Sequence, residues 1–185
     1  MKTLVCLVEE PSARYMLEGV LPRLLPNINT HFIVFEGKQD LEKQLVKKIM
    51  YWQKLDSLFL VLRDQDSGDC VSIKNNLTNL CDKTGKKGVL VRIACRELES
   101  YYFGDLAAVE IGLGFSNNSL AKFAKKARYR IPDNIENVSD ELLKITSGTY
   151  QKSLGSRAIG KYLSIENNTS NSFNSLIAGL KNLFG

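Results

Sequence analysis

Short apolar runs alternate along the first hundred residues with segments whose apolar side chains recur at helical spacing. The runs lie at residues 4–8, 32–35, 58–62 and 89–93, and each predicts a strand. A run that is apolar at every position is typical of a strand buried on both faces of a parallel sheet. The sequence therefore predicts a core in which each strand is followed by a helix.

The helices are predicted from this spacing and from the placement of proline and glycine. The first opens at Pro11 and is expected to end or bend at Pro22. The next three are expected over residues 41–53, 70–80 and 97–106. A strand and a helix repeated in this way predict an α/β fold with a parallel sheet of about four strands and flanking helices.

The second half of the chain is less regular. Residues 112–118 are predicted to form a loop, and 119–130 a basic helical segment. Ser139 is expected to open a short helix through residue 145, and a last helix ends at residue 184. We interpret residues 1–185 as a single domain, with a core over about 1–106 and a mixed C-terminal appendage over about 107–185.

Composition narrows the class of protein. The chain is 44% hydrophobic and 24% charged, as expected of one soluble globular domain. Its apolar runs fall far short of the roughly 20 residues that cross a bilayer, so no membrane association is expected. The apolar start is short and is followed at once by Glu9 and Glu10, which argues against a signal peptide and for a cytoplasmic location.

The cysteines and the histidine do not predict a binding site for a metal such as zinc. Cys6, Cys70, Cys81 and Cys95 form no CxxC pair, so neither a zinc ribbon nor a redox motif is predicted. We expect buried, reduced thiols. The single histidine, His31, cannot build a histidine-rich metal site.

Acidic residues follow three of the predicted strands. Because the carboxyl ends of parallel strands meet at one edge of the sheet, these side chains are expected to lie close together. Residues two apart on extended backbone also point the same way. Bare carboxylates would repel one another, and Mg²⁺ or Mn²⁺ would relieve that repulsion through oxygen ligands. The residues are Glu9 and Glu10 after the first strand, Asp64 and Asp66 after the third, and Glu97 and Glu99 after the fourth.

Other interpretations of these acids stay open. Glu97 and Glu99 could cap the helix that they open, and Asp66 could belong to a turn. A receiver-type phosphoacceptor domain also carries acids after its first and third strands. It would need a hydroxyl residue after strand four and a lysine after strand five, whereas Ala94 and Cys95 follow strand four here and no fifth strand is evident.

The net charge of +5 and the pI of about 9.0 are compatible with a nucleic-acid partner. Residues 122–130 contain several basic residues and no acidic residue, and Phe123 and Tyr129 lie between the basic ones. Such a segment could hold phosphates and stack on bases. A solvated basic helix face is the equally good alternative. The basic residues are Lys122, Lys125, Lys126, Arg128 and Arg130.

Several motifs together resemble a known family. The chain is similar to the Toprim-like proteins of unknown function that are related to the nuclease half of overcoming-lysogenization-defect (OLD) proteins. The resemblance spans nearly the whole chain, and its most specific part is the Arg-Glu-x-Glu block with its aromatic pair. The motifs are VEEPS at 8–12, DQD at 64–66 with Cys70 after it, RIACRELESYY at 92–102, YQK at 150–152 and SNSF at 170–173.

The resemblance implies a Toprim-like, Rossmann-like fold and Mg²⁺-dependent phosphodiester chemistry on nucleic acid, with nuclease activity as the expected form of that chemistry. Glu9 would be the acid or a metal ligand, and Asp64 and Asp66 would be metal ligands. Lys152 would stabilise charge that develops on phosphate. Glu97 and Glu99 would be second-site ligands or positioning groups.

Two positions depart from the family pattern. Glu10 replaces an expected glycine, and Ala13 replaces a common acid. These departures favour an alternative function, a non-catalytic interaction module. The resemblance implies that such a module would partner an AAA-type ATPase.

Overall fold

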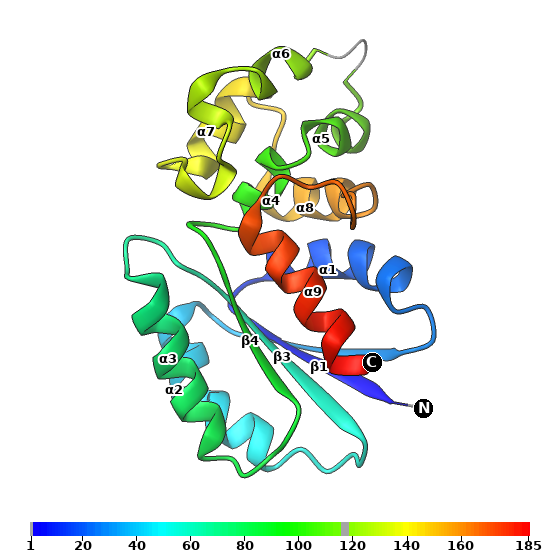
Figure 1. The fold of residues 1–185 in the computed structure, drawn as a ribbon, viewed down its shortest axis with the longest axis vertical. Helices are drawn as coiled ribbons and strands as arrows, with labels where there is room; N and C mark the ends of the chain where they lie inside the picture. Colours follow the sequence, from blue (N-terminus) through cyan, green and yellow to red (C-terminus); the bar gives the residue numbers. More distant parts are fainter. Residues whose placement is uncertain (1, 116–118) are drawn as a thin grey trace.

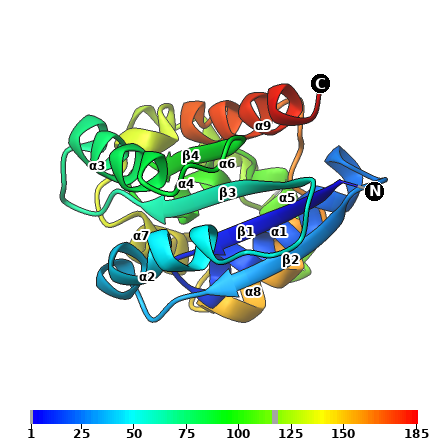
Figure 2. The ribbon, with the colours of Figure 1, turned by 90° about the horizontal axis from the view of Figure 1, so that it is seen from below.

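One parallel sheet forms the centre of the molecule (Figure 1). The computed structural model describes residues 2–115 and 119–185, so the last three residues of the predicted 112–118 loop lie outside it. Figure 2 shows the strands side by side in the order β2-β1-β3-β4. This arrangement confirms the predicted α/β class. The strands are β1 (Thr3–Val8), β2 (Asn29–Val34), β3 (Ser57–Asp64) and β4 (Val89–Ala94).

Helices cover both faces of the sheet because its inner strands are apolar on both sides. Leu4, Cys6 and Val8 of β1 pack with helices on one face, whereas Val5 and Leu7 pack with α2 and α3 on the other. This alternation follows from the two-residue period of a strand. The flanking helices are α1 (Pro11–Leu24) and α9 (Asn171–Phe184) on the first face, and α2 (Lys38–Met50) and α3 (Cys70–Asp82) on the second.

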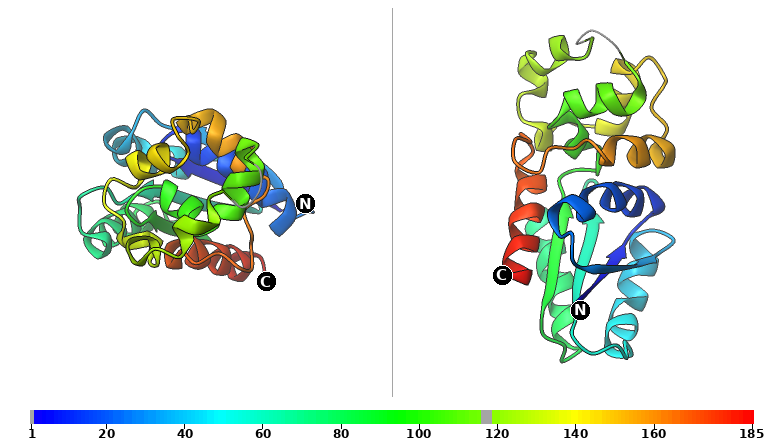
Figure 3. Two further views of the ribbon diagram at one scale, coloured as in Figure 1. Left: turned by 90° about the horizontal axis from the view of Figure 1, so that it is seen from above. Right: turned by 90° about the vertical axis from the view of Figure 1, so that its right-hand side faces the viewer.

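Short helices form a cap beyond the carboxyl ends of the strands. The side view in Figure 3 separates this cap from the sheet and its flanking helices. Within the described residues, no helix is long and apolar enough to cross a membrane. The cap consists of α4 (Glu99–Phe103), α5 (Leu106–Leu113), α6 (Ala121–Ala124), α7 (Val138–Ile145) and α8 (Lys152–Gly160), with 3-10 turns at Ala127–Tyr129 and Pro132–Asn134.

Some predicted boundaries were wrong. The helix predicted over 97–106 is two helices, because α4 ends at Gly104 and the side chain of Asp105 accepts a hydrogen bond from Ala108 N to begin α5. The basic segment 119–130 is helical only at α6 and one 3-10 turn. Helix α1 continues through Pro22 to its end at Leu24.

Candidate functional site at the carboxyl end of the sheet

Asp64 lies at the end of β3 and is 7% exposed. The adjacent strand β1 ends one residue before Glu9, whose Oε2 accepts a hydrogen bond from the backbone N–H of Asp64 at 3.2 Å. Parallel pairing of β1 with β3 therefore places these two acids side by side.

Glu99 enters the same region from the first turn of α4 and is fully buried. Its Oε1 accepts hydrogen bonds from the hydroxyl of Tyr150 at 2.8 Å and from Ser139 Oγ at 3.5 Å. Its Oε2 has no hydrogen-bond partner among the residues that the structure describes. A buried carboxylate oxygen without a partner is costly, and such an atom calls for an explanation.

Lys152 supplies the positive charge of the site. It is the first residue of α8, and its Nζ lies 2.8 Å from Glu10 Oε1. Glu10 is the residue that precedes α1, and it also accepts a hydrogen bond from Ser12 Oγ at 2.5 Å. The ion pair thus joins the N-terminal ends of α1 and α8.

Burial and neighbouring carboxylates raise the pKa values of three acids in the site. Burial, followed by the charges of Glu99, Glu10 and Glu9, raises the pKa of Asp64 well above its usual value, against the opposing charge of Lys152. Burial also raises the pKa of Glu99, although Lys152 and the hydroxyl of Tyr150 oppose this. The pKa of Glu9 is raised too, mainly by burial.

The same crowding acts on Lys152. Burial disfavours the ammonium, but its hydrogen bond to Glu10 and the charges of Glu99 and Asp64 outweigh that effect and raise the pKa of Lys152. The lysine therefore stays protonated at neutral pH.

Asp66 and Glu97 occupy the margin of the site. The chain turns after β3, and Asp66 adopts a left-handed conformation with φ of 54°, so it does not extend the strand as expected. Asp66 Oδ2 pairs with Lys38 Nζ at 2.7 Å, while Glu97 Oε2 accepts a hydrogen bond from Ser139 N at 3.1 Å. Both acids line a pocket of about 310 Å³, together with Ser67, Arg96, Glu136 and Asn137.

Arg63 approaches the cluster from the opposite face of the sheet. Its side chain pairs with Glu42 on α2, and its Nε lies 3.9 Å from Glu9 Oε2. A buried arginine next to a buried acid lowers the repulsion among the carboxylates. The cluster is partly neutralised by cations of this chain.

The carboxylates near Asp64 would suit a hard cation, although the ammonium of Lys152 also lies near this residue. One buried oxygen of Glu99 lacks a partner among the described residues. Nevertheless, over residues 2–115 and 119–185, no three acidic, histidine or cysteine side chains lie close enough together to hold one metal ion. A cation at this position would require the carboxylates that pair with Lys38, Lys152 and Arg63 to move closer.

The basic segment lies apart from the acidic cluster, in and after α6 at the end of the molecule opposite the sheet (Figure 1). Its side chains at Lys122, Lys125 and Lys126 are exposed, and Phe123 lies beneath Lys122 and Lys126 in cation–π contacts. Arg130 is also exposed.

Two other residues of that segment contact an acid of the same chain. Arg128 forms an ion pair with Glu141 at 2.7 Å, and the hydroxyl of Tyr129 donates a hydrogen bond to the same carboxylate. Tyr129 is buried, so the expectation that it is available for stacking was wrong.

Sequence reasoning missed the partners of the acids. Tyr150 and Ser139 donate hydrogen bonds to Glu99. Glu42 pairs with Arg63 beside the cluster, and Glu10 is the partner of Lys152. Tyr150 and Glu10 had a usable signal, since both stand in motifs of the family resemblance.

Solved structures that resemble this chain include C-terminal regions of OLD proteins. The region from Burkholderia pseudomallei is 15% identical and gives a TM-score of 0.54, with 98% of each chain covered. The region from Xanthomonas campestris pv. campestris is 16% identical and gives a TM-score of 0.55, with 98% of this chain and 93% of that chain covered. At this identity the likeness establishes a shared fold.

The search of curated proteins found no match. A family profile described as a domain of unknown function, DUF4276, matches residues 8–181, which include every acidic residue of the candidate site. The chain therefore belongs to the DUF4276 family.

Proposed function

We propose that this protein is a Toprim-like nuclease that cleaves phosphodiester bonds of nucleic acid with Mg²⁺ or Mn²⁺. The observation that carries this proposal is the acidic cluster at the carboxyl end of the sheet. Asp64 is buried among the charges of Glu99, Glu10 and Glu9, and Glu99 keeps one buried oxygen without a partner among the described residues. A divalent cation would relieve this unfavourable arrangement.

Glu9, Asp64 and Asp66 would hold the cation, which would polarise a phosphoryl oxygen and lower the pKa of a bound water. Lys152, kept protonated by its carboxylate neighbours, would stabilise negative charge on the phosphate. Glu97 and Glu99 would position these groups from the first turn of the cap and the segment before it.

Two further observations support the proposal. The motifs resemble those of Toprim-like proteins, and the fold is shared with the C-terminal regions of OLD proteins over nearly the whole of both chains. In addition, the exposed lysines in and after α6 offer a surface on which a nucleic-acid backbone could bind.

The test is a cleavage assay on single- and double-stranded DNA and RNA with Mg²⁺ or Mn²⁺. Substitution of a group next to a metal ligand typically lowers activity about 10- to 100-fold, so Asp64→Asn is expected to lower cleavage by about 100-fold or more. Asp56→Asn makes the same change at an exposed residue next to the opposite end of β3 and should leave cleavage unchanged. Equal cleavage by Asp64→Asn and the wild type would refute the assignment.

The second candidate is a non-catalytic module that binds an AAA-type ATPase. The ion pairs Lys152–Glu10 and Lys38–Asp66, at 2.8 and 2.7 Å, favour this function. In each pair a lysine of the same chain already neutralises an acid that could otherwise bind a metal ion. This function predicts no cleavage of any of the four nucleic acids and no change in Mn²⁺ affinity in Asp64→Asn. It also predicts a stable complex with the ATPase, which size-exclusion chromatography would detect.

A further inference from the structure

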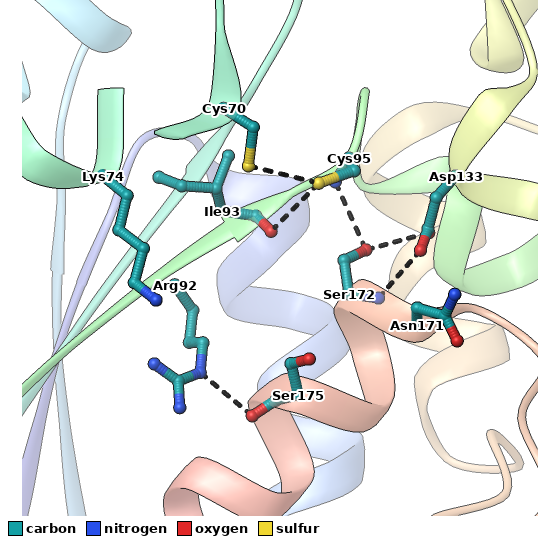
Figure 4. Close-up of a pocket in the computed structure, with 9 residues that line it drawn as sticks. All are labelled: Cys70, Lys74, Arg92, Ile93, Cys95, Asp133, Asn171, Ser172 and Ser175. Atoms are coloured by element: carbon teal, nitrogen blue, oxygen red, sulfur yellow. Dashed lines mark hydrogen bonds between the residues drawn. The ribbon is translucent and has the colours of Figure 1, made fainter. Parts of the chain in front are cut away.

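A pocket of about 340 Å³ lies beside α3, β4 and the start of α9, apart from the acidic cluster (Figure 4). Cys70 and Cys95 lie at its wall and point toward one another. Lys74, one turn after Cys70 on α3, and Arg92 of β4 line the same pocket. The pocket thus brings two sulfur atoms and two positive charges together at a position that solvent can reach.

The two thiols are close enough to react with each other. Their Sγ atoms are 3.5 Å apart, and both cysteines are free and half-buried. A disulfide needs about 2.05 Å between the sulfurs, so a modest movement of the side chains would complete the bond. The expectation that all four cysteines are buried holds for Cys6 and Cys81 but was wrong for Cys70 and Cys95.

We propose that Cys70 and Cys95 form a reversible disulfide that fastens two loops of the acidic site to each other. Cys70 follows the loop that carries Asp66, and Cys95 precedes the segment that carries Glu97. Backbone hydrogen bonds already join these loops, from Gln65 N to Ala94 O at 2.9 Å and from Asp66 N to Arg96 O at 2.7 Å. A covalent link beside them would restrict separation of the loops.

The oxidant is hydrogen peroxide. One thiolate attacks a peroxide oxygen, which breaks the O–O bond and gives a sulfenic acid and hydroxide. The second sulfur then attacks the first, the S–S bond forms, and the S–O bond breaks. The two thiol protons and the two hydroxides leave as two waters, and the two electrons reduce the peroxide. Burial, followed by its hydrogen bond with Cys70, raises the pKa of Cys95 to about 12, which disfavours the thiolate form of Cys95.

The test counts thiols in the folded full chain before and after treatment with hydrogen peroxide. The wild type is expected to lose two of its four thiols, to give a Cys70–Cys95 cross-linked peptide in mass spectrometry, and to recover all of them with dithiothreitol. Cys70→Ser and Cys95→Ser should not form the cross-link, whereas Cys81→Ala, at a buried cysteine on the same helix as Cys70, should form it. Four thiols after treatment, or a cross-link to any other cysteine, would overturn the proposal.

Hydrogen exchange tests the effect on the loops. Oxidation is expected to slow exchange of the Gln65 and Asp66 amides in the wild type and to leave it unchanged in Cys70→Ser. Unchanged exchange in wild type that carries the disulfide would refute the fastening of the loops. Neither readout involves a metal ion, so this proposal and the proposed nuclease function can fail separately.

Discussion

Asp64 has an unfavourable environment for a charged carboxylate. It is nearly inaccessible to water and lies near the like charges of Glu99, Glu10 and Glu9, and Lys152 supplies an opposing charge. Burial of a charge is tolerated in proteins when the charge is paired or bound to a metal. We infer that the fold keeps this carboxylate for its chemistry and at some expense of stability.

This inference predicts a pH dependence of stability in the metal-free protein. A raised pKa means that the folded protein binds the proton of Asp64 more tightly than the unfolded chain does. The free energy of unfolding should therefore fall as pH rises from about 4, the usual pKa, through the raised pKa of the folded state. Asp64→Asn removes this contribution, about 1.4 kcal/mol for each unit by which the pKa is raised.

Urea denaturation at a series of pH values, in the presence of a chelator, measures the effect. Asp64→Asn should lose less stability than the wild type as pH rises, while Asp56→Asn, at an exposed position, should follow the wild type. If the free energy of unfolding changed with pH equally in the wild type and in Asp64→Asn, Asp64 would not contribute to the pH dependence of stability.

At the residue scale, the sequence predicted the acids that directly follow buried strands. Glu9 and Asp64 lie together because strand register is set by the apolar pattern. Asp66 was not predictable in the same way, because β3 ends at Asp64 and the backbone then turns. The Lys152–Glu10 pair depends on the packing of two helices far apart in the sequence, which no local pattern encodes.

Helices α1 and α8 hold that pair in place by an unusually close approach. A Cβ atom on Gly19 would lie 2.4 Å from the carbonyl carbon of Gly160, and one on Gly160 would lie 2.6 Å from Met16 O. Arg23 at the end of α1 also donates hydrogen bonds to the carbonyls of Gly160 and Leu163, at 2.9 and 2.8 Å. The two glycines therefore set the distance between α1 and the C-terminal end of α8, whose N-terminal residue is Lys152.

We expect Gly160→Ala to destabilise the protein, although alanine is the better helix former by about 1 kcal/mol. The added methyl group meets backbone that cannot rotate away, and such overpacking typically costs about 1–3 kcal/mol. Chemical denaturation measures the change, with Ser153→Ala at an exposed position of the same helix as the control. A variant as stable as the wild type would show that the contact between the helices is loose.

At the element scale, the four strand–helix repeats were predictable because their apolar periods are long and regular. The break between α4 and α5 was missed although Gly104 and Asp105 carry a recognisable stop and start signal. The basic segment after residue 119 was predicted as one helix, but Arg128 and Tyr129 are held by Glu141 of α7. Tertiary contacts outweigh local helix propensity there.

Charge is divided between two ends of the cap. The acids lie where the cap meets the sheet, and the exposed lysines in and after α6 lie at the far end (Figure 1). A nucleic acid that reaches the acids would also need a contact that offsets their repulsion of phosphate. The exposed lysines in and after α6 would supply such a contact under the proposed function.

We expect the double variant Lys122→Glu/Lys126→Glu to weaken nucleic-acid binding. Each phosphate contact contributes roughly 0.9 to the slope of log affinity against log salt on duplex DNA, so the slope should fall by about 2. Fluorescence anisotropy at several salt concentrations measures this. Lys47→Glu/Lys48→Glu changes two exposed lysines of α2 by the same charge and serves as the control. Equal loss in both variants would assign the effect to net charge alone.

At the scale of the whole molecule, the central proposal is that acids from chain segments far apart in sequence bind one hard cation by moving closer together than they lie in the structure. Isothermal titration of Mn²⁺ into the metal-free protein tests it most directly. We predict saturable binding by the wild type and by Asp56→Asn, and loss of that binding in Asp64→Asn. No binding by the wild type, or equal binding by Asp64→Asn, would contradict the claim.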